Sequence, residues 1–231
     1  MGSGTWAARR GQIETYFDRT AAEAWKRLTS DAPVSGIRAT VRAGREAMRA
    51  TLLSWLPAEM SGLRLLDAGC GTGALAVEAA RRGADVVAID VSRSLIEVAR
   101  ERAPATRGRL RFAVGDMLDP ALGVFDHVVA MDSLIHYRPT DAVAALAGLA
   151  PRTRGSLLFT FAPRTPLLAA MHAVGRVFPR RDRAPAIEPL AEAALRRLIS
   201  REPALARFAV RHTRRVQSGF YTSQAMELAA P

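Results

Sequence analysis

The stretch LLDAGCGTGALA, residues 65–76, decides the fold of this protein. It begins as an apolar run of strand type, continues with three glycines at alternate positions, and ends in residues that favour a helix. Glycines at such a junction permit positive φ angles and let backbone N–H groups approach a ligand, because no Cβ stands in the way. The stretch therefore predicts a strand, a ligand-binding turn and a helix, as in an open α/β sheet.

Strand-type and helix-type segments alternate along most of the chain. Apolar runs predict strands over 63–69, 85–90, 110–116, 125–132 and 155–163. Amphipathic runs predict helices over 74–82, 93–102 and 140–149. Repeated strand–helix units of this length form parallel sheets with helices on both faces, joined by right-handed crossovers. Two terminal β runs, 208–217 and 220–228, are separated by the dipeptide SG and predict an antiparallel hairpin at the sheet edge. The predicted fold is therefore α/β and Rossmann-like, a mostly parallel sheet of seven strands with a C-terminal antiparallel hairpin.

The N-terminal part of the chain lies outside this alternation. Helical spacing of apolar residues predicts helices over 12–28 and 37–55, whereas residues 1–11 carry no motif. We therefore divide the chain into N-terminal helices at 1–56, expected to form a lid, and a ligand-binding domain at 57–231.

A second departure is an insertion at about 164–200, on the side of the sheet where a substrate is expected. Helices are expected over 166–176 and 189–200. Between them lies VFPRRDRAPAIEP, residues 177–189, which is rich in proline and arginine.

Composition restricts the class of protein. The 231 residues are 49% hydrophobic without a long polar tract, which predicts one folded α/β domain with a full core. No apolar run approaches the roughly 20 residues that a membrane-spanning helix needs, and the N-terminus lacks the apolar core of a secretory signal. The sequence thus predicts a cytoplasmic protein. Cys70 is the single cysteine, which excludes an intramolecular disulfide and a cysteine-based zinc cluster.

The chain is basic, since 33 Lys and Arg against 22 Asp and Glu give a net charge of +11. Every basic residue except Lys26 is an arginine, and the arginines are spread along the whole chain. Aromatic residues make up only 6%, so the interleaved stacking surface of a single-strand nucleic-acid binder is missing, and we expect no nucleic-acid partner. A basic surface also attracts acidic substrates and anionic lipid head groups.

The glycine loop by itself fits two kinds of ligand. It satisfies the loose dinucleotide pattern G-x-G-x-x-A, and Asp90 follows at the expected distance of about 20 residues. Asp67 argues against a dinucleotide, because a carboxylate there repels a pyrophosphate. The same carboxylate attracts the ammonium group of S-adenosylmethionine, whose ribose hydroxyls suit Asp90, while Asp116 and Met117 offer an acid and a thioether to its adenine. We therefore predict S-adenosylmethionine as the cofactor. Its predicted contacts are Asp67, Gly69, Cys70, Gly71, Gly73, Asp90, Val91, Asp116, Met117, Met131, Asp132 and Ser133.

These acids and glycines, in this order, resemble the class I S-adenosylmethionine-dependent methyltransferases, whose sheet also ends in an antiparallel hairpin. A narrower resemblance covers nearly the whole chain. It rests on YFDRTAAEAWKRL (16–28), VSGIRATVRAGREAMR (34–49), AMDSLIHY (130–137), FTFAPRTPLL (159–168) and VFPRRDRAP (177–185). These blocks resemble the magnesium-protoporphyrin IX O-methyltransferases of chlorophyll and bacteriochlorophyll biosynthesis. The resemblance implies transfer of a methyl group from S-adenosylmethionine to one propionate of the metalloporphyrin, which gives the monomethyl ester.

MDSLIHY, residues 131–137, changes abruptly from a buried strand to polar side chains. In the predicted sheet this segment borders the glycine loop, with His136 on the acceptor side. His136 would either hold the acceptor carboxylate or act as a general base. The alternative is a histidine that caps the following helix. The resemblance favours His136 as catalytic, with Tyr16 over the cofactor.

The substrate carries carboxylates, which the planar guanidinium of arginine suits. Residues predicted to bind the substrate are Trp25, Arg164, His172, Arg180, Arg181 and Arg183. For the arginines, a solvated basic loop or a protein partner is the alternative. No histidines and acids have the spacing of a metal site, and we predict no resident metal, because the magnesium arrives inside the substrate.

Two other functions remain open from the sequence. One is a class I methyltransferase with a different small acceptor, and the other is a non-catalytic scaffold that binds S-adenosylmethionine. The intact acids and glycines of the loop argue against the scaffold. Amphipathic basic N-terminal helices and a greasy substrate also suggest peripheral membrane association, and the resemblance suggests contact with the magnesium chelatase that supplies the porphyrin.

Overall fold

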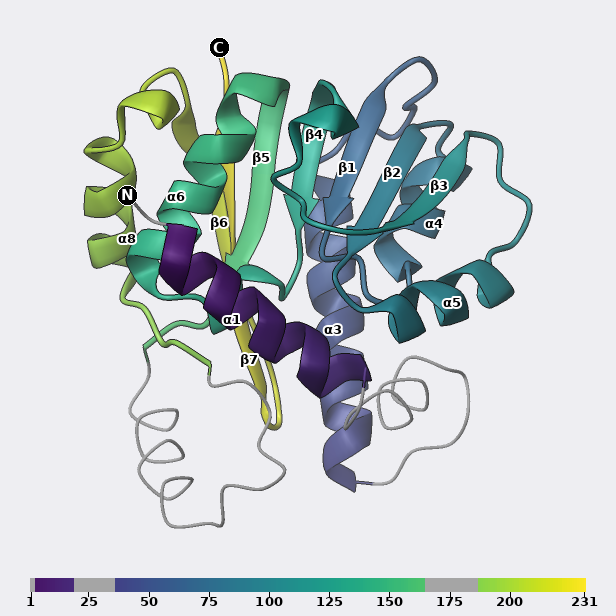
Figure 1. Ribbon diagram of the computed structural model, residues 1–231, viewed down its shortest axis with the longest axis horizontal. Helices are drawn as coiled ribbons and strands as arrows, with labels where there is room; N and C mark the ends of the chain where they lie inside the picture. The colour runs from purple at the N-terminus through teal and green to yellow at the C-terminus, as the bar shows by residue number, and fades with distance from the viewer. Residues whose placement is uncertain (1–2, 19–35, 165–186) are drawn as a thin grey trace.

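The structure, a computed structural model, describes residues 3–18, 36–164 and 187–231 (Figure 1). The described helices are α1 (Ser3–Tyr16), α3 (Gly36–Ser54), α4 (Ala74–Arg81), α5 (Arg93–Arg102), α6 (Pro139–Leu149) and α8 (Glu192–Ser200). The strands are β1 (Arg64–Ala68), β2 (Asp85–Asp90), β3 (Leu110–Val114), β4 (Phe125–Ala130), β5 (Thr153–Phe161), β6 (Ala209–Ser218) and β7 (Tyr221–Ala229). The helix expected at 166–176 lies outside the described residues.

All seven strands form one sheet in the order β3-β2-β1-β4-β5-β7-β6. The strands from β3 to β5 are parallel, whereas β7 runs antiparallel to both β5 and β6. The order of strands reverses between β1 and β4, which pair directly. Ligands bind beyond the carboxyl ends of the strands at such a reversal. The predicted fold, including the hairpin at the sheet edge, is confirmed.

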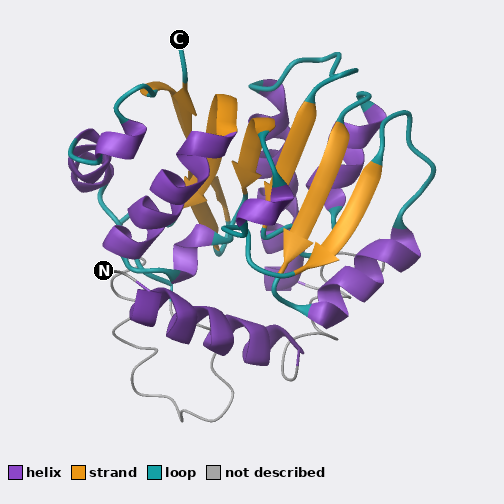
Figure 2. Cartoon of the chain, turned by 45° about the horizontal axis from the view of Figure 1, so that its top comes forward, coloured by secondary structure: helices purple, strands orange, loops and turns teal. Residues whose placement is uncertain are grey.

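Helices cover both faces of the sheet (Figure 2). On β1, Leu65 packs into the core beneath α3, α4 and α5, whereas its neighbour Leu66 packs into the core beneath α6 and α8. Both side chains are fully buried. Because successive residues of a strand point to opposite faces, a strand with both faces covered is continuously apolar. This explains why the parallel strands read as unbroken apolar runs in the sequence.

The N-terminal helix begins earlier than the sequence predicts. The apolar spacing places its start at residue 12, but α1 begins at Ser3 and crosses the carboxyl ends of the strands (Figures 1 and 2). Trp6 stacks on Tyr137 with ring centroids 4.0 Å apart. A helix of mostly polar residues is stabilised mainly by such tertiary contacts, which local periodicity does not reveal. The expected start of this helix at residue 12 is therefore wrong, and the helix begins at Ser3.

Helix α3 packs against the hairpin formed by β6 and β7. Met48 and Leu52 are fully buried on this side of the helix. At Gly44 a Cβ atom would stand 2.4 Å from the ring of Tyr221, so glycine is required for this close approach. The contact brings one face of α3 to the carboxyl edge of the sheet.

The predicted insertion leaves and rejoins the sheet at one point. Pro163 and Leu190 form a β-bridge, and the Arg164 backbone N–H donates to the Leu190 carbonyl at 3.1 Å. Pro163 and Leu190, which flank most of the predicted insertion, therefore meet beside the end of β5. Within the described ranges, no helix is both long and apolar enough to cross a membrane.

Candidate active site

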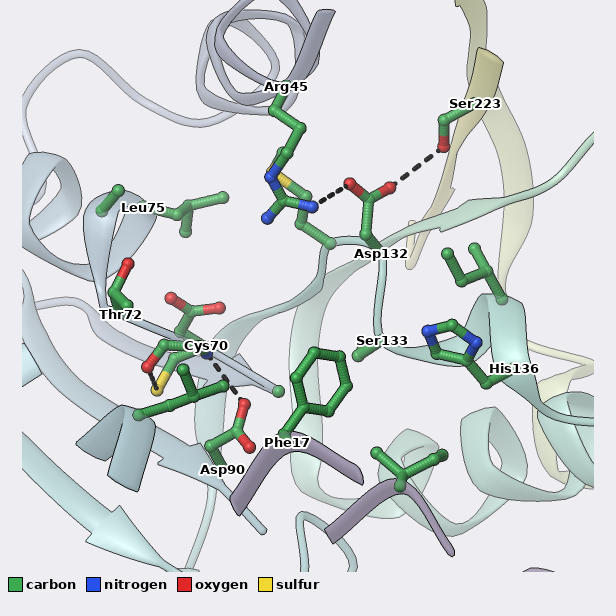
Figure 3. A pocket seen from close by; sticks show the side chains of 18 of the residues that line it. Phe17, Arg45, Cys70, Thr72, Leu75, Asp90, Asp132, Ser133, His136 and Ser223 are labelled. Carbon is green, nitrogen blue, oxygen red and sulfur yellow. Dashed lines mark hydrogen bonds and ion pairs between the residues drawn. The ribbon is translucent and has the colours of Figure 1, made fainter. Parts of the chain in front are cut away.

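A cavity of about 570 Å³ opens at the carboxyl edge of the sheet. Its walls come from the ends of β1, β2 and β4, from α1 and α3, and from the start of β7 (Figure 3). Cavities of this size bind small molecules and cofactors.

The glycine loop follows β1 and packs against the residues that follow β4. Gly69 has φ +83°, and a Cβ atom there would stand 2.3 Å from the Cβ of Ser133. The Ser133 hydroxyl donates to the Ala68 carbonyl at 2.8 Å. Two residues further on, the Gly71 N–H donates to Asp90 Oδ2 at 2.8 Å. The loop thus requires glycine both for its backbone conformation and for its close packing.

Asp67 ends up as a buried acid on the cavity wall. Its side chain is only 2% exposed, and its Oδ2 has no hydrogen-bond partner among the described residues. Burial, and then the charge of Asp90, raise the pKa of Asp67 to about 7. A cation in the cavity would give this oxygen a partner and favour the ionised form. The orphaned oxygen therefore fits a ligand with an ammonium group, as S-adenosylmethionine has.

Asp90 lies at the end of β2 and also lines the cavity. Its two oxygens accept from the backbone N–H groups of Ser92, at 2.9 Å, and Gly71. Burial is the main reason that the pKa of Asp90 is raised. Lone pairs of its oxygens remain available to hydroxyl donors such as those of a ribose.

Asp18 connects the end of α1 to the same corner. Its Oδ1 accepts from the Ser92 hydroxyl at 2.6 Å and from the hydroxyl and N–H of Ser94 at 2.6 and 3.1 Å. Ser92 is in turn the N-cap of α5, where its side chain accepts from Leu95. The segment after α1 is therefore attached beside Asp90.

Asp116 is engaged by protein groups. Its Oδ1 accepts from the Leu118 N–H at 2.9 Å, while its Oδ2 accepts from Arg10 and, at 3.4 Å, from the indole N–H of Trp6. Met117, and not Asp116, lines the cavity at this level. The carboxylate that the sequence assigns to adenine thus holds α1 in position.

Asp132, the second residue of MDSLIHY, gathers donors from three elements. It has φ +53°, which is unusual for a residue other than glycine. Its carboxylate accepts from Arg45 at 2.7 Å, from Tyr221 at 3.0 Å, and from Ser223 and Thr160 at 3.1 Å each (Figure 3). The side chain is 6% exposed. Asp132 therefore ties α3, β5 and β7 together at the cavity wall.

Sequence reasoning missed the arginines of α3. Arg42, Arg45 and Arg49 all line the cavity. Their spacing of three and four residues puts them on one face of a helix, and this spacing was the available signal. The sequence does not reveal which face of α3 turns toward the sheet, because that depends on its packing against Tyr221.

The cavity is covered by α1 and bordered by the turn after β4. Ile13, Tyr16 and Phe17 line it from α1, and the Tyr16 and Phe17 rings meet edge to face with centroids 5.2 Å apart. His136 lines it from a short 3₁₀ helix, Leu134–His136. Burial raises the pKa of the Tyr16 phenol, so the hydroxyl stays protonated and can donate.

The structure brings most of the predicted site residues together. Those that line the cavity are Tyr16, Asp67, Gly69, Cys70, Gly71, Asp90, Val91, Met117, Met131, Asp132, Ser133 and His136. Gly73, Asp116 and Arg164 do not line it; the place of a Gly73 Cβ is taken by the Phe112 ring, and Arg164 is exposed. Outside the described residues lie Trp25, His172, Arg180, Arg181 and Arg183.

An open parallel sheet with a glycine loop, acids at the ends of β1 and β2, and a cavity beyond them defines a class I S-adenosylmethionine-dependent methyltransferase. A general methyltransferase-domain model matches residues 65–154, and the model of the magnesium-protoporphyrin IX methyltransferase C-terminus matches residues 130–230. The chain is 50% identical over 224 residues to a magnesium-protoporphyrin O-methyltransferase of Rhodobacter capsulatus, across 96% of this chain and 97% of that one. The chain belongs to the magnesium-protoporphyrin O-methyltransferase family.

A solved structure agrees with this assignment, and a more distant relative has a different acceptor in its name. The crystal structure of magnesium protoporphyrin IX methyltransferase from Synechocystis PCC 6803 with bound SAH superposes with a TM-score of 0.83 at 27% identity, over 96% of this chain and 99% of that chain. A ubiquinone biosynthesis O-methyltransferase of Xanthomonas euvesicatoria is 32% identical, but over only 76% of this chain and 72% of that one. The similarity therefore extends over more of the chain for the Rhodobacter and Synechocystis porphyrin enzymes than for this quinone-pathway relative.

Proposed function

We propose that this protein transfers a methyl group from S-adenosylmethionine to a propionate carboxylate of magnesium-protoporphyrin IX, forming the monomethyl ester in chlorophyll or bacteriochlorophyll biosynthesis. The observation that carries the proposal is the 50% identity to the Rhodobacter capsulatus enzyme across nearly the whole chain. The cavity supports it, because Asp67 and Asp90 lie beside the glycine loop, whereas the arginines of α3 and His136 line other parts of the wall.

The acid side of the cavity suits the cofactor. When bound, S-adenosylmethionine supplies a methyl group on a positively charged sulfur. Asp67 would hold the ammonium group, Asp90 the ribose hydroxyls, and the loop from Gly69 to Gly71 would approach the ligand with its backbone. The unsatisfied oxygen of Asp67 supports this arrangement. The neighbouring Met117 and Val91 line the cavity and would cover the apolar surface of the adenine.

The acceptor needs orientation more than deprotonation. A propionate has a pKa near that of glutamate, about 4.3, so it is already an anion at neutral pH. Its attack on a cationic sulfur neutralises charge, which a dry, correctly aligned site favours. His136 would hold the carboxylate in position, and the Tyr16 hydroxyl would contact the ligands from above. The apolar side chains of Ile13 and Phe17 would exclude water.

We propose that the N-terminal helices within residues 1–56 act as the lid of this site. Two contacts of this segment support this role: Arg10, midway along α1, pairs with Asp116, and Asp18, beyond the end of the helix, accepts from Ser92. The face of α1 between these contacts carries the residues that line the cavity.

The direct test is to incubate the protein with magnesium-protoporphyrin IX and methyl-labelled S-adenosylmethionine and to separate the pigments by chromatography. Label in a monomethyl ester is the expected result. Binding of the cofactor by calorimetry without label in the porphyrin would refute the acceptor and leave the methyltransferase class intact. A quinol and a small carboxylic acid, tested in parallel, would then identify the acceptor class.

We further propose that the protein is cytoplasmic, associates peripherally with membranes and receives its porphyrin from the magnesium chelatase. Ile37 at the start of α3 and Phe220 in the hairpin turn are 57% and 56% exposed, and Phe220 borders the cavity. Apolar tips beside a basic helix suit an anionic lipid surface. Co-sedimentation with anionic but not neutral vesicles, and capture of purified chelatase, are the expected results; recovery in the supernatant with both kinds of vesicle would contradict membrane association.

A further inference from the structure

The arginines of α3 form a cationic wall of the cavity, which we call the α3 arginine face and define as Arg42, Arg45 and Arg49. All three line the cavity. In Figure 3 the guanidinium of Arg45 enters from α3 on the side away from Asp90. Along a helix rising 1.5 Å per residue, Arg49 lies about 6 Å beyond Arg45 and Arg42 about 4.5 Å before it. The positive charges are therefore spread along one wall.

The middle arginine is neutralised within the protein. Arg45 donates to Asp132 at 2.7 Å, and the Asp132 carboxylate also accepts from Tyr221, Ser223 and Thr160. Hydrogen bonds from four side chains leave this carboxylate little capacity for a further partner. Asp132 therefore neutralises Arg45, the middle arginine of the face, and has little capacity to act as a counter-ion for Arg42 or Arg49.

The residues that the structure describes offer Arg49 no such partner. Within the described part of the chain, no hydrogen bond or ion pair is made to its guanidinium, and its side chain is half-buried at the cavity wall. Glu46, the one acidic residue of α3, also lines the cavity and is exposed. A guanidinium that lines a ligand cavity and has no counter-ion among the described residues favours an anionic ligand group. Its planar fork matches a carboxylate, which it binds with two parallel hydrogen bonds.

We propose that Arg49, with Arg42 on the same face, is a carboxylate-binding site of this cavity. The ligands of the proposed function, on which this inference rests for their identity, offer two sources of that group. One is the carboxylate at the amino-acid end of the cofactor. The other is the propionate of the porphyrin that is not methylated. Either contact would fix the distance between the α3 wall and the reacting atoms, since a bound ligand would be held at both of its ends.

The test compares each ligand with a form that lacks the carboxylate. Calorimetry measures the binding of S-adenosylmethionine and of decarboxylated S-adenosylmethionine, which keeps the ammonium and the sulfonium. Fluorescence titration measures the binding of magnesium-protoporphyrin IX and of its dimethyl ester. Both are carried out on the parent protein, on Arg49→Gln and on Arg49→Lys. The matched control is Arg38→Gln, which removes the same charge from an exposed position of α3 that does not line the cavity.

We expect Arg49→Gln to weaken binding of one carboxylate-bearing ligand by at least about tenfold, and to leave binding of its carboxylate-free form within about twofold of the parent. The arm in which the loss appears identifies the source. Arg49→Lys should lose less, because it keeps a point charge but not the fork. Arg38→Gln should match the parent with all four ligands.

Equal losses for carboxylate and carboxylate-free ligands, or no loss in either arm, would overturn the proposal. The variants are expected to fold because the described residues make no hydrogen bond or ion pair with Arg49 that the substitution would break, and a thermal melt checks this. Should the parent protein fail to bind the porphyrin, the proposed acceptor would fall, and the cofactor arm alone would decide the role of Arg49.

Discussion

The Asp18 carboxylate and the Ser92 hydroxyl lie 2.6 Å apart, which attaches the end of α1 to the residue that caps α5. The backbone N–H of the same serine donates to Asp90 at 2.9 Å. One residue therefore contacts both the acid proposed to bind the ribose and the segment that follows the covering helix. The segment after α1 and the proposed cofactor site are therefore linked through Ser92.

Asp18→Ala should weaken cofactor binding without removing any group that we assign to the cofactor. It deletes the acceptor of three hydrogen bonds and frees the end of α1. We expect the Kd for S-adenosylhomocysteine, measured by calorimetry, to rise about fivefold to tenfold. Glu14→Ala, which removes an exposed acid from the same helix, should bind like the parent. Equal affinities for the Asp18 variant and the parent would contradict the connection.

Cofactor affinity should depend on pH through Asp67. The pKa of Asp67 is raised to about 7, so the side chain is mostly neutral at pH 6 and mostly ionised at pH 8. An ammonium group binds the ionised form, and affinity should therefore rise about tenfold from pH 6 to pH 8. Binding at pH 6 should release a proton, detected by calorimetry in two buffers of different ionisation enthalpy. Asp67→Asn should bind weakly at both values, and a parent affinity that is flat with pH would refute the role of Asp67.

The same substitution should make the cofactor-free protein more stable. Between pH 3.8, the ordinary pKa of an aspartate, and about 7, the folded protein holds a proton on Asp67 that the unfolded chain has lost. The folded state binds more protons in this window, so stability falls as pH rises through it. Asp67→Asn avoids this loss and should raise the Tm by at least about 2 °C at pH 8. At pH 3.5 the two proteins should melt within about a degree of each other.

Gly69→Ala tests the close packing of the β1 and β4 ends. An alanine there meets the Ser133 side chain at 2.3 Å and also adopts φ +83°. Gly62→Ala is a matched control, because Gly62 has φ +79° with open space where the Cβ would be. The control should lose about 1 kcal/mol of stability from backbone strain alone and keep cofactor binding. Gly69→Ala should lose more stability and bind the cofactor at least about tenfold more weakly. Equal effects of the two substitutions would show that the Ser133 side chain can move away from the added Cβ without further loss of stability.

Local sequence predicted the elements that local interactions determine. The expected strand at 85–90 and helix at 93–102 match β2 and α5 at both ends, because Ser92 caps the helix and an apolar run defines the strand. The start of α1 was not predictable in this way. It depends on the contact of Trp6 with Tyr137, which are distant in the sequence.

The residues of the candidate site also fall into those that local sequence predicts and those that depend on tertiary contacts. Asp67 and Asp90 were predictable, because each lies near the end of an apolar strand whose carboxyl end borders the cavity. The sequence did not reveal that Asp116 turns toward Arg10, or that Tyr221 meets Asp132, because both contacts join segments about 90 residues apart or more. Tertiary packing alone decides which polar group faces the ligand and which faces another element.

His136→Ala should lower kcat at the low end of the range for a general base, by about 10² or less. The propionate needs no base, so the loss reflects orientation. His136→Gln keeps a hydrogen-bond donor and should recover part of the rate. His127→Gln is the control, since His127 contacts Ser156 at 2.8 Å within the sheet and does not line the cavity. The measurement is steady-state methyl transfer, and a loss in kcat below about threefold for the alanine variant would remove His136 from the mechanism.

Asp132→Asn should be among the more destabilising conservative changes at the cavity wall. The carboxylate is 6% exposed, and its loss leaves the Arg45 guanidinium, itself only 22% exposed, without this counter-ion. Removing one partner of a buried pair costs about 3 kcal/mol, measurable as a shift of the urea midpoint. Glu59→Gln is the control, because it breaks an ion pair of similar length between Glu59 and Arg107. These two side chains are 60% and 61% exposed, so the substitution should change stability little.

The double variant Arg45→Met with Asp132→Asn separates pairing from packing. If the cost arises from a buried charge without a partner, removing both charges should destabilise less than the sum of the two single variants. If instead the cost arises from the hydrogen bonds of Tyr221 and Ser223 to Asp132, the two effects should add. Asparagine weakens these hydrogen bonds to the same extent whether or not Arg45 is present. An additive result would mean that Asp132 serves mainly to hold β7 at the cavity wall.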